Sequence, residues 1–94
     1  MRIAQVVGTV TLSRCHPSFQ GARLRLVVPL SLAELSQACV PAADELVTWD
    51  ELAAGIGQRV AISEGSEAAQ PFRPQIKPVD AYTAAILDQI ELEP

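Results

Sequence analysis

The sequence predicts a mainly β fold, a small sheet of about five strands curled into a partly closed barrel. Five short stretches carry alternating or strand-forming apolar residues, and glycines lie at the joints between them. The chain has 94 residues, which allows one hydrophobic core and one domain spanning residues 1–94. Closure suits so few strands, because it removes sheet edges that would otherwise pair with other chains.

The first two strands are expected at Arg2–Ser13 and Arg23–Leu30. One face of the first strand is apolar, and Gly8 interrupts that face, as glycine does where a barrel strand turns a corner. In the second strand, strict alternation predicts Leu24 and Val27 on opposite faces. These strands would form half of the barrel wall.

The middle of the chain supplies two more strands, at Glu45–Asp50 and Gln58–Glu64, joined by a glycine-bearing corner. The preceding segment, Ser31–Asp44, is interpreted as a variable loop with a short helix. Ser31 is its expected N-cap residue, and Pro41 prevents the helix from continuing.

The last third is expected to contain an exposed loop, a helix and a strand. Glu67–Pro78 is polar, proline-rich and without periodicity. Val79–Ala85 suits a short helix with Asp80 in its first turn, where the helix dipole favours an acid. Ile86–Leu92 then alternates as the final strand. The predicted architecture is therefore a five-stranded OB-like β-barrel with one short helix before the last strand.

No set of residues predicts an active site. Cys15 and His16 are adjacent soft ligands, but the chain has two cysteines and one histidine, whereas structural zinc normally takes four ligands. We therefore interpret the pair as loop residues. Ala-Gly-Ile-Gly at 54–57 resembles a phosphate-binding turn, but it lacks the third glycine, the long helix and the lysine of such sites. Several carboxylates lie along the chain and nothing selects a catalytic pair: Asp44, Glu45, Asp50, Glu51, Glu64 and Glu67. We expect no catalytic residue, metal or cofactor.

Charge and composition argue against nucleic-acid and membrane partners. The net charge is −4, which disfavours binding to phosphate groups. Only four residues are aromatic, so few rings are available to stack on nucleic-acid bases. Residues 1–30 carry +4 (Arg2, Arg14, Arg23 and Arg25), whereas residues 31–94 carry three basic and eleven acidic residues, a net −8. The simplest interpretation is that basic and acidic strands neighbour each other, within one subunit or between subunits. Because no long apolar segment is present, we expect a soluble cytoplasmic protein.

Five motifs follow one another in order along the chain. They are Met1–Val10, Pro17…Gly21-x-x-Leu24-x-Leu26-Val27, Asp50-x-x-x-Ala54-Gly55-Ile56-Gly57-x-x-Val60, Gly65-Ser66, and Pro78-Val79-Asp80-Ala81 with Ile86-Leu87-Asp88. In this order they resemble the EutN/CcmL family of bacterial microcompartment vertex proteins. Ala53 stands where that family has glycine, so a positive φ is not expected there. Glu67 stands where the family has serine.

The resemblance implies a structural protein rather than an enzyme. Members of this family form cyclic pentamers that cap the fivefold vertices of a polyhedral shell in the cytoplasm, and the facets of that shell are hexameric shell proteins. A closed ring needs two unlike faces on each subunit, and the basic and acidic parts of the chain supply a candidate pair.

The resemblance and the charge pattern suggest candidate sites. The turn after the fourth strand is a candidate rim for a central opening, or else an ordinary strand-ending turn (Glu64, Gly65, Ser66, Glu67). Candidate subunit or shell contacts are Arg23, Arg25, Gly55, Gly57, Pro78, Val79 and Asp80. Two other functions stay open: an OB-fold module that binds single-stranded nucleic acid or a small ligand, and a small accessory subunit of an enzyme.

Overall fold

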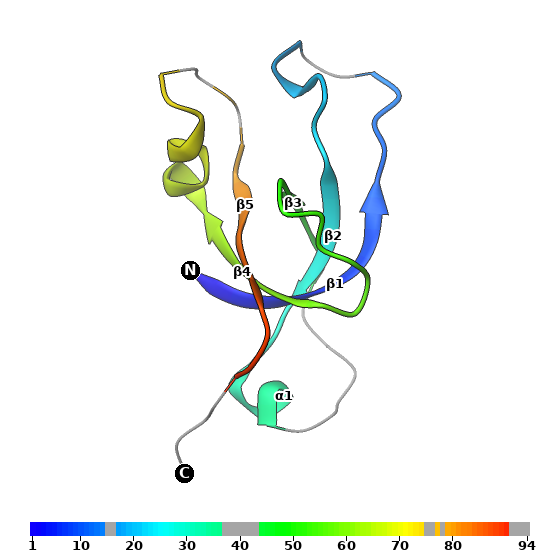
Figure 1. The fold of residues 1–94 in the computed structure, drawn as a ribbon, viewed down its shortest axis with the longest axis vertical. Coiled ribbons are helices and arrows are strands. Elements are labelled where there is room, and N and C mark those ends of the chain that lie inside the picture. The colour runs from blue at the N-terminus through cyan, green and yellow to red at the C-terminus, as the bar shows by residue number, and fades with distance from the viewer. Residues whose placement is uncertain (15–16, 37–43, 75–76, 78, 91–94) are drawn as a thin grey trace.

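The computed structural model describes residues 1–94 except 15–16, 37–43, 75–76, 78 and 91–94. Its strands form a closed barrel in the order β1-β2-β3-β5-β4 (Figure 1). The strands are β1 (Arg2–Val10), β2 (Leu24–Pro29), β3 (Leu46–Trp49), β4 (Arg59–Glu64) and β5 (Ala81–Leu87). The helical elements are η1 (Pro17–Phe19), α1 (Leu32–Ser36) and η2 (Gly65–Phe72). The barrel and its first four strands confirm the prediction.

The barrel closes through antiparallel pairs and one short parallel contact. β1 pairs with both β2 and β4, β2 pairs with β3, and β4 pairs with β5, all antiparallel. β3 and β5 run parallel and meet at Trp49 and Tyr82. The β3–β5 junction is therefore the weakest seam in the wall, since the other four pairs each extend over several residues.

A bulge in β1 bends the wall at the expected glycine. Val6 pairs with Val27 and Gly8 pairs with Leu26, so the register shifts between Val6 and Gly8. An extra residue of this kind increases strand twist and bend. Leu24 and Val27 of β2 are both buried, at 7% and 0% exposure, and they pack in different hydrophobic clusters.

Two hydrophobic clusters stabilise the subunit. The first lies among β1, β2 and β4 and the β3–β4 loop: Ala4, Val6, Val27, Ala54, Val60 and Ile62. The second surrounds Trp49 and draws on η1, η2 and β5: Leu24, Ala68 and Val79, with Val10, Phe19, Ala22, Phe72 and Tyr82 partly buried against them. The second cluster joins two segments that extend from one end of the barrel, the β1–β2 connection with η1 and the β4–β5 connection with η2 (Figure 1).

The last strand lies earlier than the sequence predicts. Ala81–Leu87 forms β5, so the helix expected at Val79–Ala85 was wrong and Asp80 caps no helix. Alanine-rich composition favours helix locally, but this segment pairs with the whole length of β4. The pairing satisfies backbone groups and closes the barrel, and this outweighs local propensity. The end of the strand expected at Ile86–Leu92 lies partly outside the described residues.

A 3-10 helix replaces the first half of the exposed loop expected at Glu67–Pro78. η2 spans Gly65–Phe72, and Ala68 within it is fully buried. The loop prediction was wrong here because the small side chain of Ala68 and the aromatic ring of Phe72 pack in the second cluster. η2 is the short helix that precedes the last strand.

The capped helical turn after β2 is confirmed. The hydroxyl of Ser31 accepts a hydrogen bond from the Glu34 backbone N–H at 3.2 Å, and the Glu34 carboxylate accepts one from the Ser31 N–H at 3.1 Å. This reciprocal pair is a capping box. α1 lies at the end of the molecule opposite η1 and η2 (Figure 1). Pro41 and Cys39 lie outside the described residues, as do Cys15 and His16.

Candidate functional site

The β3–β4 loop is organised by one buried carboxylate. Asp50, which is 0% exposed, accepts hydrogen bonds from the backbone N–H groups of Leu52 at 3.2 Å and Ala54 at 2.8 Å. Arg25 donates from Nε to the Ala54 carbonyl at 2.8 Å, and the same Nε lies 3.5 Å from the Asp50 carboxylate. Both polar groups of the Ala54 backbone are therefore held by charged side chains.

The remainder of the loop is held at the glycine corner. The Gly55 N–H donates to the side-chain oxygen of Gln58 at 2.6 Å, and the Gly57 N–H donates to the Val6 carbonyl at 2.8 Å. Gly57 has a φ of 91°. Ile56 between them is 71% exposed, one of the most exposed large apolar side chains described. The corner predicted at 55–57 is thus rigid, and it presents an aliphatic side chain to solvent.

Ala53 takes the left-handed conformation that the sequence argued against. Its φ is 58°, so the expectation of an ordinary negative φ was wrong. Asp50 holds the N–H groups on both sides of Ala53, and these two bonds impose the turn on whichever residue lies between them. Asp50 is also the residue that sequence reasoning undervalued. The signal was present, since an aspartate at the start of a glycine-rich corner commonly binds backbone N–H groups a few residues on.

The two candidate arginines of β2 have different environments. Arg23 is exposed, and its carbonyl accepts the Asp50 N–H at 2.8 Å. Arg25 has a side chain only 17% exposed, and it is occupied within the subunit by Asp50 and Ala54. Of the pair, Arg23 is the one whose charge is displayed on the surface.

The candidate rim begins with an ion pair. Arg2 binds the Glu64 carboxylate through two hydrogen bonds of 2.5 and 2.9 Å. Arg2 lowers the pKa of the Glu64 carboxyl, chiefly through these hydrogen bonds. Gly65 follows with a φ of 66°, and its N–H donates to the Asp80 carbonyl at 2.9 Å. Ser66 and Glu67 are exposed in the first turn of η2. All four residues therefore reach the surface, and the Glu64 carboxylate is paired there with Arg2.

The candidate contact segment before β5 is only partly displayed. Val79 is 8% exposed and packs in the second cluster, whereas Asp80 is exposed. Pro78 lies outside the described residues. Within this segment, Asp80 is the described residue whose side chain can meet another protein.

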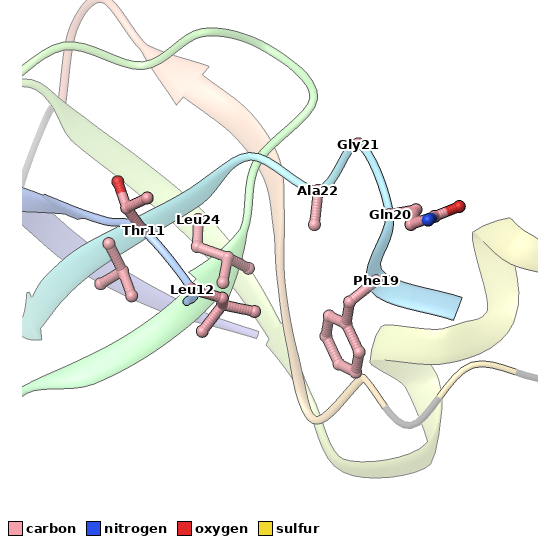
Figure 2. A pocket seen from close by; sticks show the side chains of 8 residues that line it. Thr11, Leu12, Phe19, Gln20, Gly21, Ala22 and Leu24 are labelled. Carbon is pink, nitrogen blue, oxygen red and sulfur yellow. The ribbon is translucent and has the colours of Figure 1, made fainter. Parts of the chain in front are cut away.

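Apolar hollows flank the second cluster. One, of about 330 Å³, lies against the loop that connects β1 to β2, with Leu12 and Leu24 on one side and Phe19 on the other (Figure 2). A neighbouring hollow of about 290 Å³ shares these residues and extends to Val47 and Asp80. Leu12 and Val47 are 43% and 47% exposed. Such surfaces suit contact with a protein better than acid–base chemistry, because the lining of the first hollow contains no ionisable side chain.

The aromatic residues are used within the subunit. Phe19, Trp49, Phe72 and Tyr82, the four aromatics of the chain, form a continuous series with ring centroids 4.8 to 5.5 Å apart. The Lys77 ammonium lies 5.0 Å from the Trp49 ring centroid and donates to the Ser18 carbonyl at 2.6 Å. Base stacking needs an exposed ring face, and Trp49 is only 6% exposed.

Within the part of the chain that the structure describes, no three His, Cys, Asp or Glu side chains gather as a metal site. The helices among those residues also include none that is long and apolar enough to cross a membrane.

Comparison with known proteins gives one consistent family. Residues 1–88 match the family described as ethanolamine utilisation protein EutN/carboxysome. The carboxysome shell vertex protein CcmL of Synechococcus elongatus is 41% identical over 93 residues, which cover 99% of this chain and 89% of that protein. The solved structure of Gloeobacter violaceus CcmL is 31% identical with a TM-score of 0.86, covering 99% of this chain and 91% of that one. The pentameric microcompartment shell protein GrpN of Rhodospirillum rubrum is 28% identical with a TM-score of 0.80 over 100% of both chains. The chain therefore belongs to the EutN/CcmL family.

Proposed function

We propose that this chain is a structural subunit that forms a cyclic homopentamer and occupies the fivefold vertices of a polyhedral bacterial microcompartment shell in the cytoplasm. One observation carries the proposal: sequence and fold both match, along nearly the whole chain, proteins named as shell vertex proteins, one of them pentameric. In this proposal residues 1–94 form one barrel domain, and hexameric shell proteins are the neighbours of the ring.

The surface supports assembly rather than catalysis. A head-to-tail ring requires two different complementary patches on each subunit. Exposed aliphatic side chains include Leu12 and Val47, which line one hollow, and Ile56 at the glycine corner. Arg23 and Asp80 display opposite charges. We propose no catalytic function, cofactor or metal for the chain.

For the central opening we propose the turn that starts η2. Five copies would bring Gly65, Ser66 and Glu67 around the symmetry axis. Glu64 contributes little charge there, since Arg2 neutralises it. Exposed Glu67 would instead supply the negative charge that repels anions.

For contacts with neighbouring shell tiles we propose the exposed corner Gly55–Gly57 and the segment around Asp80. The corner offers an aliphatic side chain on a backbone that glycine lets approach closely. Asp80 offers an exposed negative charge to a partner.

The test is the mass of the native protein. Native mass spectrometry should detect a ring of about 50 kDa, five times the 10.1 kDa chain, whose mass does not change when single-stranded oligonucleotide is added. A monomer or dimer that shifts on adding oligonucleotide would establish the OB-fold binding module instead. A stable complex with a catalytic chain, purified from the native host, would establish the accessory subunit. The net charge of −4 and the packing of the aromatic rings against one another within the subunit favour the first outcome.

A further inference from the structure

We propose that Asp50 and Arg25 are positioning residues, whose role is to hold the loop 51–57 in the shape that contacts a neighbouring shell protein. This inference rests on the proposed function, since it assigns a purpose to one of the surfaces suggested above. It also gives Arg25 an internal role in place of the intersubunit role suggested by charge alone.

The first argument is the free-energy cost of burying the charges of Asp50 and Arg25. Asp50 is fully buried, and Arg25 is largely buried beside it. A buried ion pair commonly adds little net stability, because desolvating two charges offsets most of their attraction. Such a pair does supply directional hydrogen bonds, and here both side chains bind the backbone of one residue, Ala54. Both the N–H and the carbonyl of Ala54 are bound, at 2.8 Å each.

The second argument is that the loop is strained and nevertheless fixed. Ala53 has a φ of 58°, which a side chain disfavours. Strained residues persist only where surrounding bonds over-determine the local conformation. The loop is bound at its start by Asp50 and at its end by the bonds from Gly55 to Gln58 and from Gly57 to Val6.

The third argument is what the fixed loop displays. Ile56 and Leu52 are 71% and 45% exposed, whereas Ala54 between them is buried in the first cluster. A single chain gains nothing from holding two aliphatic side chains rigidly in water. A binding surface does gain, because a loop ordered in advance loses less conformational entropy on contact.

The experiment separates loop geometry from general stability. Asp50→Asn keeps the size of the side chain but replaces one acceptor oxygen by a donor that faces the backbone N–H groups. Arg25→Lys keeps the charge but loses the planar guanidinium that serves Ala54 and Asp50 together. Thr48→Val is the matched control, since it removes the buried 3.2 Å hydrogen bond between Thr48 of β3 and Thr83 of β5, neither of which is in the loop.

Each protein is co-expressed with a hexameric shell protein from the same organism, and its content per purified shell is measured by quantitative mass spectrometry. Hydrogen exchange at Leu52 and Ala54, thermal melting and native mass are recorded in parallel. For Asp50→Asn and Arg25→Lys we expect roughly tenfold or faster exchange at those amides. We also expect an intact ring of about 50 kDa and a content per shell reduced by about tenfold. Thr48→Val should melt earlier and enter shells at the wild-type level.

The inference is overturned if the two loop variants enter shells at the wild-type level while their amides exchange faster. It is also overturned if Thr48→Val is lost from shells as fully as they are. Should Asp50→Asn fail to fold, Arg25→Lys carries the same comparison. Absence of the wild-type chain from shells, or absence of its ring, would refute the proposed function, and the inference would fall with it.

Discussion

The guanidinium of Arg2 and the carboxylate of Glu64 form a two-bond ion pair, with Nε 2.5 Å from Oε1 and an Nη 2.9 Å from Oε2. The pair joins the first residue of β1 to the last residue of β4, 62 positions later in the chain. Each partner stabilises the charged form of the other, so the Arg2 pKa is raised and the Glu64 pKa is lowered, in both cases chiefly by the hydrogen bonds. The stability that this ion pair gives to the pairing of β1 with β4 therefore depends on pH.

Replacing Glu64 by glutamine should reduce the acid sensitivity of the fold. Because folding lowers the Glu64 pKa below its ordinary 4.5, the contribution of this group is present above that value and is lost as pH falls. Urea denaturation between about pH 5 and pH 3 should show the free energy of unfolding declining more steeply for wild type than for Glu64→Gln. The difference will be small, since the pair is exposed to solvent. Parallel declines would show that the pair does not contribute.

Changing Ala53 to glycine should stabilise the protein by about 0.5–1 kcal/mol, because glycine adopts the observed φ of 58° without strain. Gly57→Ala is the converse change at a φ of 91°. A Cβ there would contact nothing within 4 Å, so only backbone strain should act, and we expect a loss of about 1–2 kcal/mol. Chemical denaturation should show a higher free energy of unfolding than wild type for Ala53→Gly and a lower one for Gly57→Ala. Equal changes in the same direction would contradict the assigned conformations.

The hydroxyl of Tyr82 should ionise above pH 10. Burial raises its pKa above the ordinary value of 10.0, and the hydrogen bond to Glu51 at 3.1 Å raises it further. Tyr82 is the only tyrosine, so ultraviolet titration of the phenolate reports this group alone. Glu51→Gln should move the midpoint toward 10. Because the protonated phenol is favoured by folding, its contribution to stability is lost as pH rises through the folded-state pKa. An unchanged midpoint in Glu51→Gln would exclude the carboxylate as a cause.

Reversing the charge of Arg23 should weaken the ring at low salt. Arg23 is exposed and tests the attraction between basic and acidic faces directly, whereas Arg25→Glu would also break the internal bonds to Ala54 and Asp50. Native mass spectrometry of Arg23→Glu should show several-fold less ring than wild type in dilute buffer, with the difference shrinking as salt screens the charges. Arg23→Lys is the control and should assemble normally. A full ring in Arg23→Glu would refute the charge-pairing hypothesis.

The local sequence pattern predicted an element correctly where several neighbouring residues favoured the same structure. Alternation located the first four strands, and Gly8 marked the bulge that bends β1. Ser31 was correctly predicted as the N-cap of α1, since its hydroxyl accepts the Glu34 N–H. Pattern was a poor guide at β5, where alanine-rich sequence favours helix but pairing with β4 requires a strand. It also missed the buried role of Asp50, which depends on an arginine 25 positions earlier in the chain.

By itself, the sequence determined the β class, the glycine corners and the membership of the EutN/CcmL family, because these follow from the order of residue types along the chain. Only the tertiary structure decided that Ala53 is left-handed, that Arg25 is internal, and that the four aromatic rings pack against one another in tilted and edge-to-face pairs. The internal position of Arg25 and the aromatic series depend on groups distant in sequence that the fold brings together, whereas the left-handed Ala53 depends on local bonds to the buried Asp50 carboxylate. Contacts of that kind outweigh the preferences of a residue's immediate neighbours.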